Sequence, residues 1–369
     1  MSETTGVRSA RVQGTVRIVG AGLLGSSIGH ALREHGVDVA LDDTSPGQLR
    51  LAVDYGAGRP AQDDDTPVLV VVAVPPDVTA DVIERELTRF PDAVVTDVAS
   101  VKLEPLRVLR DRGVDLSRYI GSHPLAGRER GGAIAARADI FTGRPWVVCR
   151  DEETSSSDLA LVEGLALDLG ATPIEMTPEE HDRAVALVSH VPQIVASVLA
   201  GRFADAPDGS LRLAGQGVRD TTRIAASAPE LWVQILGANS APVVDVLDAI
   251  AADLASVAAA LRDVDVPGAR RAVADAIRRG NDGVERLPGK HGQNRRFESI
   301  VVMVDDTPGQ LGRLFGELGE LGVNVEDLRL EHSPGAQFGL AEISIVPSVV
   351  RAATEGLEAR GWRIASVND

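Results

Sequence analysis

The chain has 369 residues, of which 44% are hydrophobic and 25% are charged, as in a soluble globular protein of two or three domains. Its net charge of −17 argues against nucleic acid or an anionic membrane as a partner, because both would repel it. The single cysteine, Cys149, rules out an intrachain disulfide and a cysteine-only metal site, and its apolar neighbours make it a poor candidate for catalysis.

The N-terminal residues 1–14 are polar and lack the apolar core of a signal peptide. The longest apolar run, residues 68–76, is too short to span a bilayer. We therefore expect a cytoplasmic protein.

Strand-like and helix-like segments alternate over residues 1–176, which predicts an α/β domain with a doubly wound parallel sheet of Rossmann type. Strands are expected at residues 16–19, 37–41, 68–74, 93–96, 119–120, 146–148 and 173–176. Helices are expected at residues 26–35, 46–55, 77–90, 103–112 and 157–169.

A glycine-rich turn follows the first strand directly and opens the first helix. Its sequence is Gly20-Ala21-Gly22-Leu23-Leu24-Gly25, the G-x-G-x-x-G pattern of dinucleotide-binding turns. The second strand ends in Asp42-Asp43, and a carboxylate there accepts hydrogen bonds from the adenosine ribose and repels a 2′-phosphate. These features predict a site for NAD rather than NADP, with Asp43 as the ribose ligand because it leads directly into the next helix.

Two polar residues follow later strands of the same sheet. Ser100 comes after the strand at residues 93–96, and His123 comes after the strand at residues 119–120. Ligands of open α/β sheets bind at the carboxyl ends of the strands, so both residues are expected to face the nicotinamide. A histidine there is a candidate base for an alcohol oxidation, although a structural role explains an isolated histidine equally well.

Residues 177–286 contain almost no strand-like run and predict an all-helical domain that serves substrate binding and dimerisation. Apolar residues recur at helical spacing, as at Val246, Ile250, Leu254, Val257 and Leu261. Residues 287–297 are basic and rich in turn-forming residues, as in a linker. Residues 298–369 then follow the order βαββαβ, which predicts a ferredoxin-like α+β domain.

Several sequence runs resemble the prephenate dehydrogenase family, the oxidoreductases of tyrosine biosynthesis. Besides the glycine-rich turn, the resemblance rests on residues 96–102 (TDVASVK), 122–129 (SHPLAGRE), 180–182 (EHD), 189–192 (SHVP), 220–225 (DTTRIA) and 229–232 (PELW). This resemblance implies NAD as cofactor, a homodimer, no metal, and prephenate as the substrate.

The resemblance also implies roles for individual residues. His123 would take the proton of the ring hydroxyl, and Ser100 would orient His123 and the substrate. Arg223 would hold a substrate carboxylate, because its planar fork can donate two hydrogen bonds. Glu129 and Asp182 would form the polar network of Arg223.

One position departs from the family pattern. Many relatives have a second histidine three residues after His190, where this chain has Gln193. Both positions are expected near the substrate side chain, so the exchange leaves open whether the substrate is prephenate or the amino acid arogenate. For His181 and His190 a helix-packing role is an equally good interpretation.

The C-terminal domain resembles an ACT domain, a small module that binds amino acids. The resemblance rests on the turn Asp305-Asp306-Thr307-Pro308-Gly309-Gln310-Leu311 after its first strand. Pro308 is expected to open the helix, and Gly309 to allow a ligand close to the helix N-terminus. With Asp306, these residues would form a regulatory site whose ligand is tyrosine.

The sequence argues against two other functions that the same domains could serve. A β-hydroxyacid dehydrogenase with a helical dimer domain would be expected to place a catalytic lysine in the second domain, but residues 151–286 contain none. A non-catalytic NAD or amino-acid sensor would not be expected to combine Ser100, His123 and Arg223.

Overall fold

The structure, a computed structural model, describes residues 10–126, 132–150, 154–287, 297–332 and 338–368. It divides into two compact units. The first comprises residues up to 205 together with residues 222–249, and the second comprises residues 206–221 and 250 onward.

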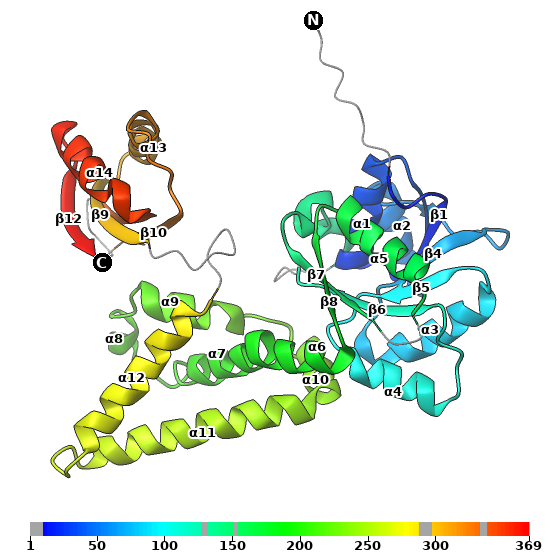
Figure 1. The fold of residues 1–369 in the computed structure, drawn as a ribbon, viewed down its shortest axis with the longest axis horizontal. Helices are drawn as coiled ribbons and strands as arrows, with labels where there is room; N and C mark the ends of the chain where they lie inside the picture. Colours follow the sequence, from blue (N-terminus) through cyan, green and yellow to red (C-terminus); the bar gives the residue numbers. More distant parts are fainter. Residues whose placement is uncertain (1–9, 127–131, 151–153, 288–296, 333–337, 369) are drawn as a thin grey trace, which may run out of the picture. The chain divides into compact units, whose positions relative to one another are not determined.

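The first unit contains an eight-stranded sheet of order β3-β2-β1-β4-β5-β6-β7-β8 (Figure 1). Its strands are β1 (Thr15–Val19), β2 (Asp38–Asp42), β3 (Arg59–Pro60), β4 (Pro67–Val72), β5 (Val94–Asp97), β6 (Tyr119–Pro124), β7 (Pro145–Cys149) and β8 (Thr172–Met176). Its helices are α1 (Leu23–Glu34), α2 (Pro46–Asp54), α3 (Pro76–Arg89), α4 (Leu103–Asp111) and α5 (Ser156–Asp168), with short 3-10 turns η1 (Ala133–Ala135) and η2 (Ala138–Phe141).

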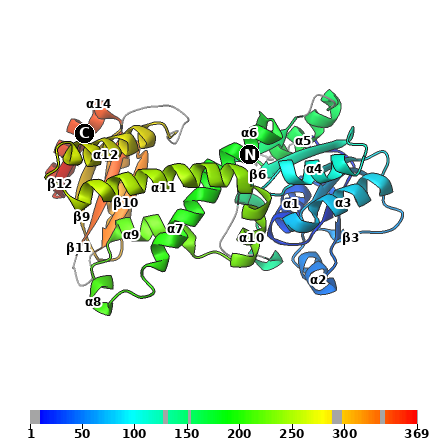
Figure 2. The same cartoon turned by 90° about the horizontal axis from the view of Figure 1, so that it is seen from below.

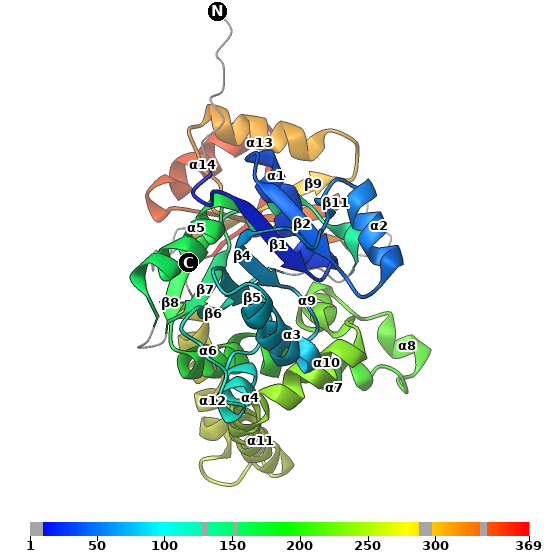
Figure 3. The ribbon, with the colours of Figure 1, turned by 90° about the vertical axis from the view of Figure 1, so that its right-hand side faces the viewer.

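The central strands are apolar on both faces because helices cover both sides of the sheet. In β4, Leu69 and Val71 pack into one core with residues of α1 and α5, whereas Val70 and Val72 pack into a second core with residues of α3 and α4. This alternation explains the uninterrupted valine run of β4. Figure 3 shows the strands of this sheet in the order β2, β1, β4, β5, β6, β7 and β8.

The prediction of an all-parallel sheet is wrong at one edge, because β7 pairs antiparallel with β6. A parallel neighbour requires a crossover that returns the chain to the starting end, usually through a helix. The connection between β6 and β7 contains instead η1 and η2, which contact α1. The two-residue strand β3 at the other edge has too few residues to give a sequence signal.

The segment after the large sheet is helical. Its elements are α6 (Pro178–Val185), the π-helix η3 (Ala186–His190), α7 (Val191–Gly201), α8 (Asp208–Leu211), α9 (Gln216–Thr222), the 3-10 turn η4 (Arg223–Ala225), α10 (Pro229–Ala238), α11 (Ser240–Arg262) and α12 (Ala269–Glu285). Figure 2 shows α11 along its length.

The first three of these elements form one continuous stretch, Pro178–Gly201, that is long and apolar enough to cross a membrane by length and composition alone. It was not expected from the sequence, because polar residues such as Ser189, His190 and Gln193 divide it into short apolar runs. One helix of this kind is weak evidence, and 33% of its most apolar window is buried.

The second unit contains a four-stranded antiparallel sheet of order β10-β11-β9-β12. Its elements follow the predicted order βαββαβ: β9 (Glu298–Asp305), α13 (Gln310–Glu320), β10 (Asp327–His332), β11 (Phe338–Ile345), α14 (Pro347–Ala359) and β12 (Arg363–Asn368). Leu314 and Leu318 of α13 and Leu357 of α14 share one core with the strand residues Ile300 and Ile343, so both helices cover the same face of the sheet.

Candidate active site

The carboxyl ends of four neighbouring strands in the large sheet are level with one another. Val19 of β1 is opposite Val72 of β4, Val72 is opposite Asp97 of β5, and Asp97 is opposite Gly121 of β6. Neighbouring strands lie about 4.8 Å apart, so the glycine-rich turn after β1 and the end of β6 are separated by roughly 14 Å along this edge. The turn and His123 therefore both lie at the carboxyl ends of the strands, where open α/β sheets bind ligands.

The three glycines of the turn have different surroundings. Gly20 has a φ of +104°, and a Cβ there would lie 2.2 Å from the carbonyl oxygen of Ala73. A Cβ on Gly25 would lie 1.9 Å from the carbonyl oxygen of Gly20. A Cβ on Gly22 would meet no atom within 4 Å. Gly20 and Gly25 thus allow the chain to pack tightly, whereas Gly22 leaves space in front of the turn.

The N-terminus of α1 is suited to an anion. Its N-cap residue, Gly22, has no capping side chain, and the first turn contains no acidic residue. The backbone amides of Leu23 and Leu24 therefore remain available, and the helix dipole adds positive potential. A pyrophosphate fits this position.

The two aspartates after β2 have different partners. Asp43 accepts a hydrogen bond at 2.7 Å from the backbone amide of Ala21, so it lies against the glycine-rich turn. Asp42 is paired at 2.5 Å with Arg17, whose side chain is buried. Asp43 is therefore the carboxylate placed for a ribose, and the residues at this edge fit the dinucleotide expected from the sequence.

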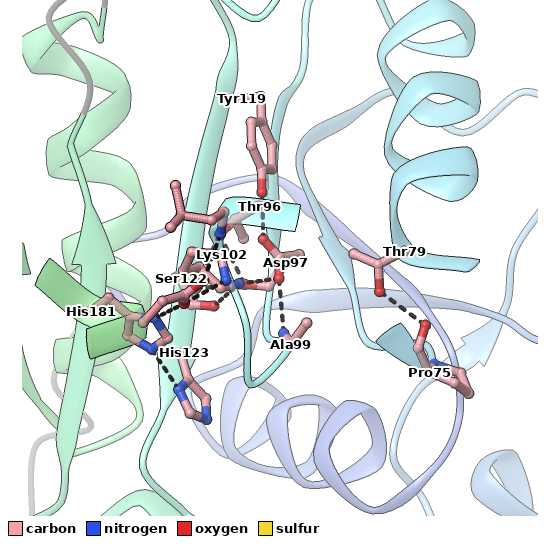
Figure 4. A network of polar contacts seen from close by, with 12 residues as sticks. Pro75, Thr79, Thr96, Asp97, Ala99, Lys102, Tyr119, Ser122, His123 and His181 are labelled. Atoms are coloured by element: carbon pink, nitrogen blue, oxygen red, sulfur yellow. Dashed lines mark hydrogen bonds and ion pairs between the residues drawn. The ribbon is translucent and has the colours of Figure 1, made fainter. Parts of the chain in front are cut away.

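A chain of hydrogen bonds leads from His123 into the protein interior (Figure 4). His123 Nδ1 lies 2.8 Å from His181 Nε2, and His181 Nδ1 lies 2.7 Å from Asp182 Oδ1. The Asp182 carboxylate also accepts the backbone amides of Lys102 and Leu103, each at 2.9 Å. All three members of the chain are buried.

The partners in this chain determine which ring nitrogens carry protons. A carboxylate can only accept, so the proton of neutral His181 is on Nδ1 and its Nε2 accepts from His123 Nδ1. His123 consequently has a lone pair on Nε2, which makes it a base. Burial, and then the proximity of His181 and Lys102, hold the pKa of His123 well below its ordinary value of 6.5, so it is neutral at pH 7.

A second buried cluster surrounds the carboxylate of Asp97. It accepts hydrogen bonds from Lys102 Nζ, from Tyr119 OH at 2.7 Å and from the amide of Ala99 at 2.8 Å. Lys102 Nζ also donates to the carbonyl oxygen of Ser122 at 2.7 Å. Burial and the Asp97 charge raise the pKa of Tyr119 well above 10, so it stays protonated as a donor. The cluster ties the loop after β5 to β6, immediately before His123.

Two residues have contacts other than those their expected roles suggest. Ser100 makes no side-chain hydrogen bond within the described part of the chain, and the ring of His123 contacts His181. Asp182, expected in the network of Arg223, is buried and accepts from His181 and two backbone amides. The sequence signal for this arrangement is the pair His181-Asp182 at the start of a helix, because a histidine next to an aspartate can be held in one tautomer. The roles of Ser100 and Asp182 toward the substrate stay predictions.

The remaining candidates for substrate binding come from α7, η3 and η4. Gln193 is buried, donates to Ser197 Oγ at 3.3 Å, and accepts from Ser227 Oγ at 3.5 Å. Arg223 begins η4, which packs against α7, so Arg223 and Gln193 are on adjoining elements. Glu129 lies outside the described residues.

His190 contacts a residue that was not among the candidates from the sequence. Its Nδ1 lies 3.1 Å from the side-chain amide of Asn239, and its ring stands edge-on to Trp232 with centroids 6.1 Å apart. Burial lowers the pKa of His190 to about 4. Asn239 lies between α10 and α11, where helix capping would be its expected role from sequence.

Cys149 lies at the end of β7 and is buried. Burial raises the pKa of its thiol to about 12. The nucleophilic thiolate is therefore absent at neutral pH, in agreement with the apolar sequence around this residue.

The second unit has a cavity at the turn after β9. Its volume is about 380 Å³, and Asp306, Pro308, Gly309 and Gly312 are among its lining residues. The prediction that Pro308 opens the helix is wrong, because α13 begins at Gln310 and Gly309 adopts a left-handed conformation with φ of +92°. Pro308 and Gly309 instead form the turn that precedes the helix.

Two family patterns match the chain. "Prephenate dehydrogenase, nucleotide-binding domain" matches residues 28–175, and "Prephenate dehydrogenase, dimerization domain" matches residues 177–274. A probable prephenate dehydrogenase, NovF, of Streptomyces niveus is 38% identical over 356 residues, which is 94% of this chain and 98% of the relative.

Two solved structures are similar. Prephenate dehydrogenase from Aquifex aeolicus, in complex with hydroxyphenyl propionate and NAD+, has a TM-score of 0.64 at 26% identity, over 73% of this chain and 99% of that one. Arogenate dehydrogenase from Synechocystis has a TM-score of 0.61 at 27% identity, over 74% of this chain and 100% of that one.

Proposed function

The chain belongs to the prephenate dehydrogenase family, and on that premise we propose that it carries out the family reaction with His123 as the base. It is an NAD-dependent oxidoreductase that acts on prephenate or arogenate. The observation that carries the assignment of the base is the buried chain from His123 through His181 to Asp182.

NAD binds at the carboxyl ends of the strands, and its site begins at the glycine-rich turn after β1. The amides of Leu23 and Leu24 at the start of α1 receive the pyrophosphate, Gly22 leaves the space for it, and Asp43 binds the adenosine ribose. When bound, NAD accepts a hydride from the carbinol carbon of the substrate.

His123 provides the proton acceptor for the same step. Its Nε2 takes the proton of the ring hydroxyl, and the imidazolium that results keeps its Nδ1 hydrogen bond to His181. The buried carboxylate of Asp182 stabilises this positive charge through His181. The ring carboxylate leaves as CO₂, and the electron pair of the broken bond completes the aromatic ring. The phenolate oxygen formed in this way takes the proton back from His123.

Arg223 and Ser100 are proposed to position the substrate. Prephenate and arogenate each carry two carboxylates, and Arg223 can hold one of them with two parallel hydrogen bonds. Ser100, after β5, is proposed to contact the ring hydroxyl near His123. The role of Glu129 in this network stays a prediction.

Gln193 bears on the choice between the two substrates. Among the described residues, its amide makes two long hydrogen bonds, both to serines, so either its oxygen or its nitrogen can turn to a ligand. The oxygen would accept from the ammonium of arogenate, and the nitrogen would donate to the keto group of prephenate. A neutral residue here is why arogenate remains a second candidate substrate.

The deciding experiment is an absorbance assay for the reduced cofactor, with prephenate and arogenate run side by side and with NAD and NADP. We expect turnover of at least one substrate and a preference for NAD that Asp43→Ala weakens. No turnover of either substrate by folded protein would exclude the function, and equal kcat/KM for both cofactors would exclude the role of Asp43.

We further propose that the protein is a homodimer and that residues 298–369 are an ACT-like regulatory domain for tyrosine. The match to a dimerisation domain supports the first proposal. The βαββαβ order and the cavity at the β9–α13 turn support the second, since ligand pockets typically have volumes of about 300–1,000 Å³.

A further inference from the structure

Asn239 is buried between two helices and joins two parts of the active site. Its Nδ2 donates to the backbone carbonyl of Asp182 at 2.8 Å and lies 3.1 Å from His190 Nδ1. A carbonyl oxygen can only accept, so the atom facing it must be the amide nitrogen. The orientation of the Asn239 amide follows from this contact.

The same nitrogen determines the protonation of His190. Both of its hydrogens are donors, so His190 Nδ1 must be an unprotonated acceptor. The proton of the neutral ring is then on Nε2. With its pKa lowered to about 4 by burial, His190 is uncharged at neutral pH. It therefore offers an N–H donor and no base.

Two further features place His190 at the reaction site. It is the last residue of the π-helix Ala186–His190, and π-helices occur frequently at functional sites. It is also linked to His123 by a series of hydrogen bonds that runs through Asn239, Asp182 and His181.

We propose that Asn239 is a positioning residue that holds His190 as a neutral hydrogen-bond donor to an oxygen of the substrate. The inference rests on the proposed function. His123 and His190 then have opposite tautomers, and both depend on Asp182, one on its carboxylate through His181 and the other on its carbonyl through Asn239. A donor that carries no charge can bind the substrate without competing for the proton that His123 must accept.

The first test reads the tautomer directly, by ¹⁵N NMR of the histidine side chains in the full-length protein. The chain has seven histidines, and His190→Gln assigns the signal of interest. We expect the Nε2–H form in the wild type and loss of this preference in Asn239→Ala. The exposed neighbour Ser240→Ala is the matched control and should leave the signal unchanged. An Nδ1–H form in the wild type would overturn the proposal.

The second test does not depend on how well Asn239→Ala folds. The side-chain amide of glutamine places a donor near the Nε2 position of histidine, whereas that of asparagine places one near Nδ1. His190→Gln should therefore keep KM within a few-fold of wild type, and His190→Asn should raise it by about one to two orders of magnitude. Equal KM values for the two variants would contradict the proposal. If the wild type turned over neither substrate, the proposed function would fail, while the NMR result would still decide the role of Asn239.

Discussion

His123 combines two properties that a base in this position needs. Its lone pair is on Nε2 because His181 accepts from Nδ1, and its charged form is disfavoured at rest by burial. The positive charge that develops on His123 during proton transfer is stabilised by the Asp182 carboxylate through the hydrogen bonds of His181. The resting ring is thus neutral, and its transiently charged form is stabilised, without any rearrangement of the surrounding residues.

Replacing His123 by asparagine tests the base separately from the fold. The asparagine amide can still donate to His181, but it cannot take a proton, so turnover should fall roughly 10²–10⁴-fold. Binding of NAD, measured by fluorescence titration, should not change. His35→Asn at the end of α1 is the control and should keep normal turnover. Near-normal turnover of His123→Asn would show that another group takes the proton.

The pH dependence of kcat/KM follows from the lowered pKa of His123. The reaction needs the neutral ring, so activity is present above the pKa in the folded enzyme and is lost as pH falls through it. Because burial holds this pKa well below 6.5, the acidic limb of the profile should lie below pH 6.5. A limb at or above that pH would contradict the assignment. The limb should be absent from the residual activity of His123→Asn.

At the residue scale, the sequence predicted roles for His123 and Asp43 but not the residues that they contact. Motif spacing places both residues at strand ends, which is local information. The contact between His123 and His181 joins residues 58 positions apart, and that between Asn239 and Asp182 joins residues 57 positions apart. Such contacts depend on how α6 and α10 pack, which hydrophobic periodicity does not specify.

At the element scale, the alternation of strands and helices was predictable, and its exceptions have local causes. The antiparallel β7 follows a connection whose described residues form two 3-10 turns, and the π-helix at residues 186–190 adds a residue to one turn within a stretch that reads as ordinary helix. Neither the direction of a strand nor an extra residue in a turn changes the pattern of apolar residues on which the predictions were based.

The glycine-rich turn allows a matched pair of substitutions at this scale. Gly25→Ala would place a Cβ 1.9 Å from the carbonyl oxygen of Gly20, so the turn must distort and the melting temperature should fall. Gly22→Ala meets no atom within 4 Å, so it should fold normally and weaken NAD binding alone, because the methyl group fills the space left for the pyrophosphate. Thermal unfolding and NAD titration of both variants distinguish these effects. The assignment of the turn would be wrong if Gly22→Ala bound NAD with unchanged affinity.

At the scale of the whole molecule, many large apolar side chains of the helical segment are exposed. Leu187 and Val188 are 60% and 61% exposed, Leu254 is 65% exposed, and Ile277 and Val284 are 65% and 69% exposed. Leu187, Val188 and Leu254 lie within residues 177–274, which match the pattern of a dimerisation domain. Exposed apolar side chains in such a domain support the proposed dimer. The proposed dimer interface would also cover part of the apolar stretch Pro178–Gly201. The cytoplasmic location stays a prediction.

The last prediction concerns communication from the C-terminal domain to the active site. If tyrosine binds in the cavity at the β9–α13 turn, it can lower activity only by favouring one arrangement of the protein over another. Gly312 lines this cavity, and a Cβ there meets no atom within 4 Å, so Gly312→Leu should fill the site without disturbing the core. Gly316, one turn further along α13, has equally open surroundings but is not a lining residue, and Gly316→Leu is the matched control.

We expect tyrosine to inhibit the wild type and the control but not Gly312→Leu. Calorimetry should show that tyrosine binds the wild type and the control and that it binds Gly312→Leu much more weakly. Equal inhibition of all three proteins, competitive with the substrate, would place tyrosine in the active site and remove the regulatory role of this cavity.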